Sequence, residues 1–266
     1  MSLIEVETQD TVATIHLNRP DKLNALSDEA VTELFTAIDT IAASDAAVVV
    51  LSGRGRGFCS GFDLSLAGGP GGDNETAFWM RRQERFASLV TRLRAMPQPI
   101  IAAVNGAAAG AGLGLALACD TRISSTAARF SSAFIKVGMS SCDIGVSWLL
   151  PRTIGSTRAF EMMLTGRLVE AEEAERIGLV MRLTQPERLL DEAGAMARQI
   201  AANGRKGTWM TKRGMWANLE APSLQAALEL ENRTQMLMLG SGDIARRARE
   251  QGFLGQPAGR KPESRG

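Results

Sequence analysis

Two glycine-rich segments and one acidic loop are the parts of this 266-residue chain whose residue types could do chemistry. The first segment is Gly57-Phe58-Cys59-Ser60-Gly61-Phe62-Asp63-Leu64, the second is Asn105–Gly114, and the loop is Gly138–Gly145, which contains Asp143. Glycines permit sharp turns, so the amide of Phe62 can face a ligand instead of a neighbouring strand. A tight strand-to-helix turn without a ligand explains the first segment equally well.

The second segment has some features of a nucleotide-binding loop, because Gly110, Gly112 and Gly114 follow a predicted strand. Its spacing excludes the GxGxxG pattern, since the third glycine would have to stand at position 115, which is leucine. The absence of large side chains instead lets a ligand approach backbone amides at the start of a helix, where partial positive charge collects.

The other reactive residues exclude several mechanisms. His16 is the only histidine and falls inside a predicted strand, and no serine stands in a GxSxG nucleophile elbow. Cys59, Cys119 and Cys142 are too scattered for a disulfide framework or a CxxC metal site. We therefore expect a structural role for His16, no metal site and a reducing compartment.

Charge and hydropathy favour small molecules or further copies of the chain as partners. The formal net charge is +1, so no overall field attracts nucleic acid or an anionic membrane. The longest apolar stretch, 100–118, is interrupted by Asn105 and by glycines, and the first ten residues lack the apolar core of a signal peptide. We expect a cytoplasmic protein without a membrane span.

The elements that must position these residues predict an α/β fold followed by helices. Hydrophobic patterning predicts a hairpin at Ile4–Thr8 and Val12–Leu17, a helix beginning at Ser27, a helix over Thr76–Ala95 and buried strands at Ala47–Ser52 and Ile100–Val104. Beyond residue 150 it predicts helices over Thr157–Leu164, Ala171–Ile177, Pro186–Ala202, Lys206–Trp216 and Ser223–Leu239. We expect a mobile loop at Gly68–Asn74 and a frayed tail at Gly255–Gly266.

Taken together, the motifs resemble the crotonase, or enoyl-CoA hydratase/isomerase, superfamily. They are Leu17-Asn18-Arg19-Pro20-Asp21-Lys22-Leu23-Asn24-Ala25-Leu26, GFCSGFDL at 57–64, NGAAAGAGLGLALACD at 105–120, Leu150-Pro151-Arg152, Leu164-Thr165-Gly166 and Ala171–Leu179. The resemblance implies a spiral of ββα units over residues 1–200 and a C-terminal helical region over 201–266 that assembles a trimer or hexamer. It also implies an acyl-CoA thioester substrate and no separate cofactor, since CoA is part of the substrate.

The resemblance assigns roles to particular residues. The amides of Phe62 and Ala111 would form an oxyanion hole for the thioester oxygen, where each donor contributes about 3–4 kcal/mol to stabilising the enolate. The residues expected to bind the substrate are Lys22, Leu23, Ala25, Ser60, Gly61, Phe62, Asp63, Leu64 and Ala111. Arg54 could meet the CoA phosphates or simply be solvated.

The sequence departs from the family's hydratases at the acidic positions. The two glutamates that hold water would fall at Gly114 and near Phe134, neither of which is acidic. The remaining catalytic candidate is Asp143, whose alternative role is to cap the helix that follows. One carboxylate suffices to move a proton between two carbons, so we expect double-bond isomerisation ahead of hydration. A non-catalytic acyl-CoA-binding subunit and an acyl-CoA thioester hydrolase remain as alternatives.

Overall fold

The computed structural model describes residues 2–68 and 75–254. Most of the expected loop at Gly68–Asn74 and the whole expected tail at Gly255–Gly266 lie outside the described residues. The chain divides into two compact units, Met1–Lys212 and Arg213–Gly266. The residues expected to carry chemistry all belong to the first unit.

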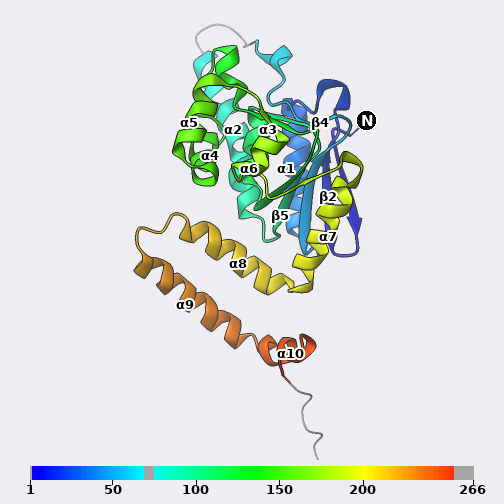
Figure 1. Ribbon diagram of the computed structural model, residues 1–266, viewed down its shortest axis with the longest axis vertical. Helices are drawn as coiled ribbons and strands as arrows, with labels where there is room; N and C mark the ends of the chain where they lie inside the picture. Colours follow the sequence, from blue (N-terminus) through cyan, green and yellow to red (C-terminus); the bar gives the residue numbers. More distant parts are fainter. Residues whose placement is uncertain (1, 69–74, 255–266) are drawn as a thin grey trace, which may run out of the picture. The chain divides into compact units, whose positions relative to one another are not determined.

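Within the described residues, the first unit contains a six-stranded and a four-stranded sheet (Figure 1). The larger sheet has the order β1 (Ile4–Gln9), β2 (Val12–Leu17), β3 (Val48–Gly53), β5 (Ile100–Val104), β7 (Thr121–Ser125) and β10 (Leu183–Thr184). The pair β1–β2 is antiparallel, as expected for the predicted hairpin, and the other pairs are parallel. All five residues of β5 and the first five of β3 are buried, which confirms the prediction that these strands are covered on both faces.

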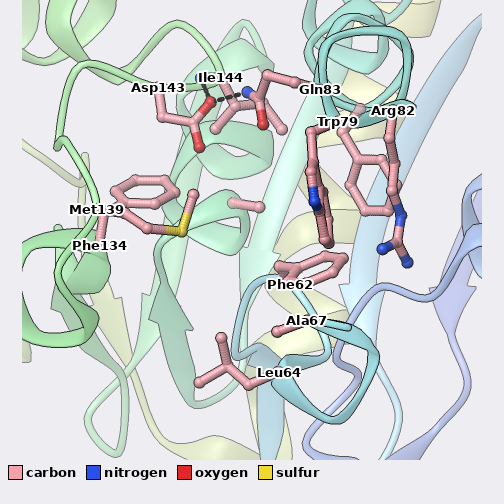
Figure 2. A pocket seen from close by; sticks show the side chains of 12 residues that line it. Phe62, Leu64, Ala67, Trp79, Arg82, Gln83, Phe134, Met139, Asp143 and Ile144 are labelled. Atoms are coloured by element: carbon pink, nitrogen blue, oxygen red, sulfur yellow. Dashed lines mark hydrogen bonds between the residues drawn. The ribbon is translucent and has the colours of Figure 1, made fainter. Parts of the chain in front are cut away.

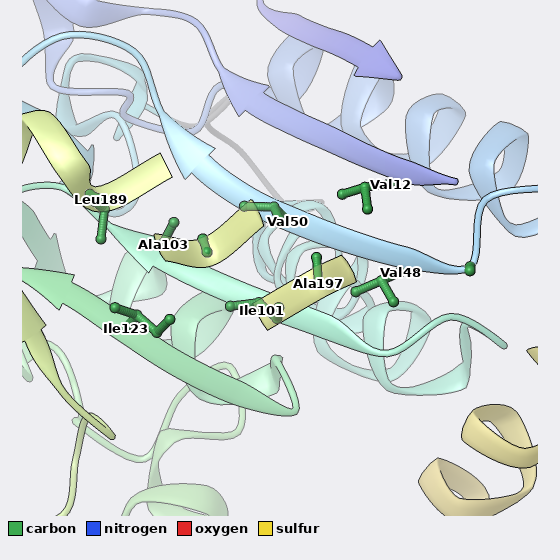
Figure 3. Close-up of a cluster of buried hydrophobic side chains, with 10 residues drawn as sticks. Val12, Val48, Val50, Ile101, Ala103, Ile123, Leu189 and Ala197 are labelled. Atoms are coloured by element: carbon green, nitrogen blue, oxygen red, sulfur yellow. The ribbon is translucent and has the colours of Figure 1, made fainter. Parts of the chain in front are cut away.

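One face of the larger sheet packs against α7 (Leu189–Ala202), and Figure 3 shows this cluster. Leu189, Ala193 and Ala197 repeat every four residues, so they lie on one stripe of the helix. They meet apolar side chains of four neighbouring strands, namely Val12, Val48, Val50, Ile101, Ala103 and Ile123. This packing fixes the strands whose carboxyl ends lead into the glycine-rich segments.

The smaller sheet consists of short strands in the order β4 (Gly57–Cys59), β6 (Ala107–Ala109), β8 (Arg129–Ser131) and β9 (Val169–Glu170). In the chain, β3 is followed by β4 and then α2 (Glu75–Ala95), and β5 is followed by β6 and then α3 (Ala111–Ala118). A strand in each sheet followed by a helix is the repeating ββα unit that the resemblance implies. The expected crotonase-like α/β fold is therefore confirmed.

The predicted helices are present with small shifts at their ends. Helix α1 (Asp28–Ala42) begins where expected, because the Ser27 hydroxyl accepts a hydrogen bond from the Ala30 amide at 3.2 Å. The remaining helices of the first unit are α4 (Val146–Ile154), α5 (Ser156–Thr165), α6 (Ala171–Arg176) and the start of α8 (Arg205–Asn218). The residues expected to begin one long helix at Pro186 form a 3-10 turn, Pro186–Arg188, before α7.

The described part of the second unit, residues 213–254, is mainly helical, as expected for the C-terminal region. It contains α9 (Leu224–Gly240) and α10 (Asp243–Glu250), and the Ser223 hydroxyl caps α9 by accepting from the Ala226 amide at 3.2 Å. Leu224 and Leu237 of α9 have exposed fractions of 76% and 67%. Among the described residues, no helix combines the length and the apolar character that a membrane span requires.

Candidate active site

A cavity of about 280 Å³ lies at the ends of the glycine-rich segments (Figure 2). Its lining residues are Phe62, Leu64, Ala67, Trp79, Arg82, Gln83, Phe86, Ala111, Phe134, Met139, Asp143 and Ile144. Most of these side chains are apolar or aromatic, so the few polar groups among them determine the chemistry that the cavity can perform. The cavity unites the three residues expected to be catalytic, Phe62, Ala111 and Asp143.

The amide of Phe62 is turned away from the strand beside it. Leu26 forms an isolated parallel bridge with Phe62, donating to the Gly61 carbonyl at 2.7 Å and accepting from the Asp63 amide at 3.0 Å. In a parallel pair these bonds use the residues that flank Phe62, so its own N–H points to the opposite side. Within the described residues this N–H donates to no acceptor.

The second amide is that of Ala111, the first residue of α3. An N–H at this helix position has no acceptor in its own helix, and Ala111 donates to none elsewhere in the described part of the chain. Gly61 allows the two segments to approach, because a Cβ at residue 61 would lie 2.8 Å from the Ala109 carbonyl oxygen and 3.3 Å from the Ala111 nitrogen. Its φ of +100° also favours glycine.

Asp143 presents its carboxyl group from the loop before α4. One oxygen, Oδ1, accepts from the Ile144 amide at 2.6 Å and from the side-chain amide of Gln83. Partial burial raises the pKa of Asp143, and the two hydrogen bonds oppose that rise. The capping alternative does not match the structure, since the residue before α4 is Gly145, with no side-chain hydrogen bond to the helix.

Ile144 and Phe134 occupy the space at the two positions where the family resemblance places the glutamates of hydratases. A Cβ at Gly114 would lie 2.6 Å from Cγ2 of Ile144 and 2.9 Å from the Ile144 carbonyl oxygen, so Ile144 occupies the space of a side chain there. Ile144 adopts a φ of +40°, which is rare for a β-branched residue and costs about 1–3 kcal/mol. Phe134 is 7% exposed and lines the cavity with its ring.

The segments expected to bind the substrate lie side by side. The Ser60 amide donates to the Leu23 carbonyl at 2.9 Å, and the Ser60 hydroxyl donates to the Lys22 carbonyl at 3.3 Å. The structure places Phe62, Leu64 and Ala111 in the cavity wall and leaves Lys22, Leu23, Ala25, Ser60, Gly61 and Asp63 outside that wall. A role for this second group therefore concerns the approach to the cavity and stays a prediction.

Several charged residues have structural partners. Asp63 caps the 3-10 turn Leu64–Leu66, and hydrogen bonds from Ser65, with one from Arg19 at 2.9 Å, hold the pKa of its carboxyl below the usual range. Arg54 pairs with Glu5 at 2.9 Å and with Glu7, so those carboxylates already bind its guanidinium. His16 is 2% exposed and lies outside the cavity wall.

The residues of α2 were missed by sequence reasoning. Trp79, Gln83 and Phe86 form one stripe along this helix, and the ring of Phe86 meets that of Phe62 edge-on at a centroid distance of 5.5 Å. Arg82 also belongs to the cavity wall, because its guanidinium stands over the Phe62 ring, 4.8 Å from the centroid, and it binds Asp28 at 2.6 Å. The residues of this stripe resemble an ordinary half-buried helix face, so only the tertiary structure shows that they line a cavity.

Comparison with known proteins identifies the family. The sequence profile described as "Enoyl-CoA hydratase/isomerase" matches residues 7–250. The Mycobacterium tuberculosis protein named "Probable enoyl-CoA hydratase EchA12" is 44% identical over 90% of this chain and 85% of its own length. The Escherichia coli "1,2-epoxyphenylacetyl-CoA isomerase" is 36% identical over 91% and 92% of the two chains.

A solved structure agrees with these relatives. The crystal structure of a "probable enoyl-CoA hydratase/isomerase" from Mycobacterium abscessus has a TM-score of 0.86 and 39% identity, covering 94% of this chain and 96% of its own. The resemblance inferred from the motifs is therefore confirmed over nearly the whole chain. The chain belongs to the enoyl-CoA hydratase/isomerase, or crotonase, family and is an enzyme that acts on acyl-CoA thioesters.

Proposed function

We propose that this enzyme isomerises the double bond of an enoyl-CoA thioester, with Asp143 as its proton carrier. The supporting observation is that Asp143 lines the same cavity as Phe62 and Ala111, whose amides have no acceptor in the described residues. Two such donors stabilise the negative charge that develops on a thioester oxygen when a neighbouring carbon loses a proton. One positioned carboxylate can remove that proton and return it to another carbon.

The proposed reaction needs no reagent besides the substrate. The thioester oxygen of a 3-enoyl-CoA accepts hydrogen bonds from the Phe62 and Ala111 amides. The Asp143 carboxylate removes a proton from C2, and the electron pair of that C–H bond moves into a dienolate whose charge rests on the oxygen. The protonated carboxyl then donates the proton to C4, which leaves the double bond between C2 and C3 and restores the thioester carbonyl.

Hydration is less well supported because it needs a second group to position water. Ile144 fills the space at Gly114, and the Phe134 ring stands near the second position, so neither offers a carboxylate. Isomerisation needs only one acid, and Asp143 is the one acid among the described residues that line the cavity. The wall formed by those residues is otherwise apolar apart from Gln83 and Arg82.

Proton exchange at the acyl group tests the proposal. Wild-type enzyme in D2O should catalyse deuterium wash-in at C2 and C4 of 3-enoyl-CoA esters. Mass spectrometry of the esters measures this exchange. Asp143→Asn should lower this exchange by about 10²–10⁴-fold, the usual contribution of a general acid or base, and should leave ester binding within about twofold. Asp10→Asn, in the exposed turn between β1 and β2, is the matched control and should exchange at the wild-type rate.

The same substrate panel separates the alternatives. It should include aromatic acyl esters, because Phe62, Trp79, Phe86 and Phe134 line the cavity and the E. coli relative is named for a phenylacetyl-CoA derivative. Accumulation of 3-hydroxyacyl-CoA would indicate a hydratase, and release of free CoA thiol would indicate a hydrolase. Calorimetric binding of esters with no exchange and no turnover would indicate a binding subunit.

A further inference from the structure

We propose that Gln83 is a positioning residue that holds the Asp143 carboxyl group by Oδ1, so that Oδ2 is presented to the acyl chain. This inference deepens the proposed function and rests on it. Gln83 stands 60 residues before Asp143, on α2, and donates its side-chain amide to Oδ1. The Ile144 amide donates to the same oxygen at 2.6 Å. Figure 2 shows the other oxygen pointing away from Gln83, on the side of Met139.

Both hydrogen bonds go to Oδ1, so the two carboxylate oxygens have different roles. The Asp143 carboxylate can rotate about its Cβ–Cγ bond. The hydrogen bond from the Ile144 amide comes from the adjacent residue, so that hydrogen bond by itself constrains the carboxylate only locally. The bond from Gln83 comes from a different helix and fixes the plane of the carboxylate relative to the cavity. Within the described residues Oδ2 accepts no hydrogen bond, which leaves its lone pairs available for a proton on carbon.

The position of Gln83 is itself fixed by packing. Phe86 lies three residues later on the same stripe of α2, is 5% exposed and meets the Phe62 ring at 5.5 Å. Arg82, the residue before Gln83, binds Asp28 and the Leu66 carbonyl, at 2.6 Å and 2.9 Å. Helix α2 therefore contacts both the Phe62 segment and Asp143. Because packing fixes the helix, the hydrogen bond from Gln83 fixes the Asp143 carboxylate relative to Phe62.

The Gln83 side chain has no other structural task among the described residues. Its amide makes a single hydrogen bond there, to Asp143, and the residue is exposed. A substitution at Gln83 should therefore leave the fold intact. The role of the Gln83 side chain is therefore to position Asp143, since that side chain does not contribute to the core.

Among the side chains around Asp143, Gln83 is the one whose substitution should change the pKa of Asp143 most directly. Arg82 of α2 is turned to Asp28, α3 has no titratable side chain, and Arg152 of α4 stacks on Trp148. Lys136 and Cys142, on the segment before Asp143, are exposed. Burial raises the pKa of Asp143, whereas the bonds from Ile144 and Gln83 lower it. Loss of the Gln83 bond should therefore raise the pKa further.

The test compares Gln83→Met, which keeps the length and removes the donor, with Glu84→Met, an exposed neighbour on the same helix. Carbon NMR of enzyme labelled at aspartate carboxyl groups, with Asp143→Asn to assign the signal, gives the titration midpoint of Asp143. Gln83→Met should move that midpoint and the acidic limb of the kcat profile to higher pH by the same amount. It should also lower kcat about tenfold on the plateau, with KM within twofold, because it removes a hydrogen bond to a charged group. Glu84→Met should match the wild type.

Two results would overturn the proposal: an Asp143 midpoint in Gln83→Met equal to that of the wild type, or a shifted midpoint with unchanged kcat. The NMR titration does not depend on turnover, so it separates this inference from the proposed function. If Asp143→Asn keeps full proton exchange, the proposed function is wrong and the catalytic role of Gln83 falls with it. If Asp143→Asn loses exchange while Gln83→Met does not, only the inference about Gln83 is wrong.

Discussion

The closed position at Gly114 predicts an unusual response to Gly114→Ala. Gly114 lies inside α3, where replacing glycine by alanine normally stabilises a helix by about 1 kcal/mol. Here the new Cβ would meet Cγ2 of Ile144 at 2.6 Å and the Ile144 carbonyl oxygen at 2.9 Å. Overpacking a core costs about 1–3 kcal/mol, and a backbone oxygen cannot move aside by rotation of a side chain. The backbone contact therefore places the cost in the upper part of this range, about 2–3 kcal/mol. Subtracting the helical gain of about 1 kcal/mol leaves a net destabilisation of about 1–2 kcal/mol.

Urea unfolding followed by circular dichroism measures this difference, with the midpoint compared at constant m value. Gly207→Ala is the matched control, because Gly207 lies in α8 and nothing stands within 4 Å of the added Cβ. That control should be more stable than the wild type by roughly 0.5–1 kcal/mol.

A second substitution tests the cause. Ile144→Ala removes the Cγ2 contact and leaves the carbonyl contact, so in the double variant Gly114→Ala should cost less than it does alone. The coupling between the two sites should be about 0.5–2 kcal/mol, as is usual for residues in contact. A Gly114→Ala variant as stable as the wild type, or independent of Ile144, would show that Ile144 does not close this position.

Three further outcomes are expected. Lys212→Met should lower the free energy of unfolding by about 3 kcal/mol in urea, because it removes the ammonium at 3.1 Å from the buried Asp120 carboxylate; a loss below about 1 kcal/mol would contradict this. The pKa of Asp143 is raised in the folded state, so the native protein binds more protons between the unfolded and folded values and stability falls as pH rises through that interval. Asp143→Asn should therefore unfold at a higher urea concentration than the wild type at pH 7, and a lower midpoint would contradict the burial argument. Light scattering at micromolar concentration should show a trimer or hexamer, since helices over 206–216 and 223–239 carry many apolar residues, and a monomer would refute this expectation.

Hydrophobic period and length predicted the long elements of the fold. Val12–Leu17 and Ile100–Val104 were predicted with the bounds that the structure has. Ile100–Val104 was found because continuous burial leaves an unbroken apolar run, and Val12–Leu17 because β-branched residues cluster or alternate there. The strands of the smaller sheet were not predicted. β4 and β6 have three residues each and consist of small or mixed side chains, so they show no alternation that could distinguish them from a turn.

The sequence by itself determined the family and the two glycine segments, because turns that bring backbone close to a ligand require residues without side chains at fixed spacing. It also drew attention to Asp143, the one acid in the loop after the two vacant glutamate positions. Only the tertiary structure decided which residues meet Asp143, because Gln83 reaches it from a separate helix. The same holds for Ile144 and Gly114: the sequence shows a missing glutamate, but the filling of its space depends on packing between segments 30 residues apart.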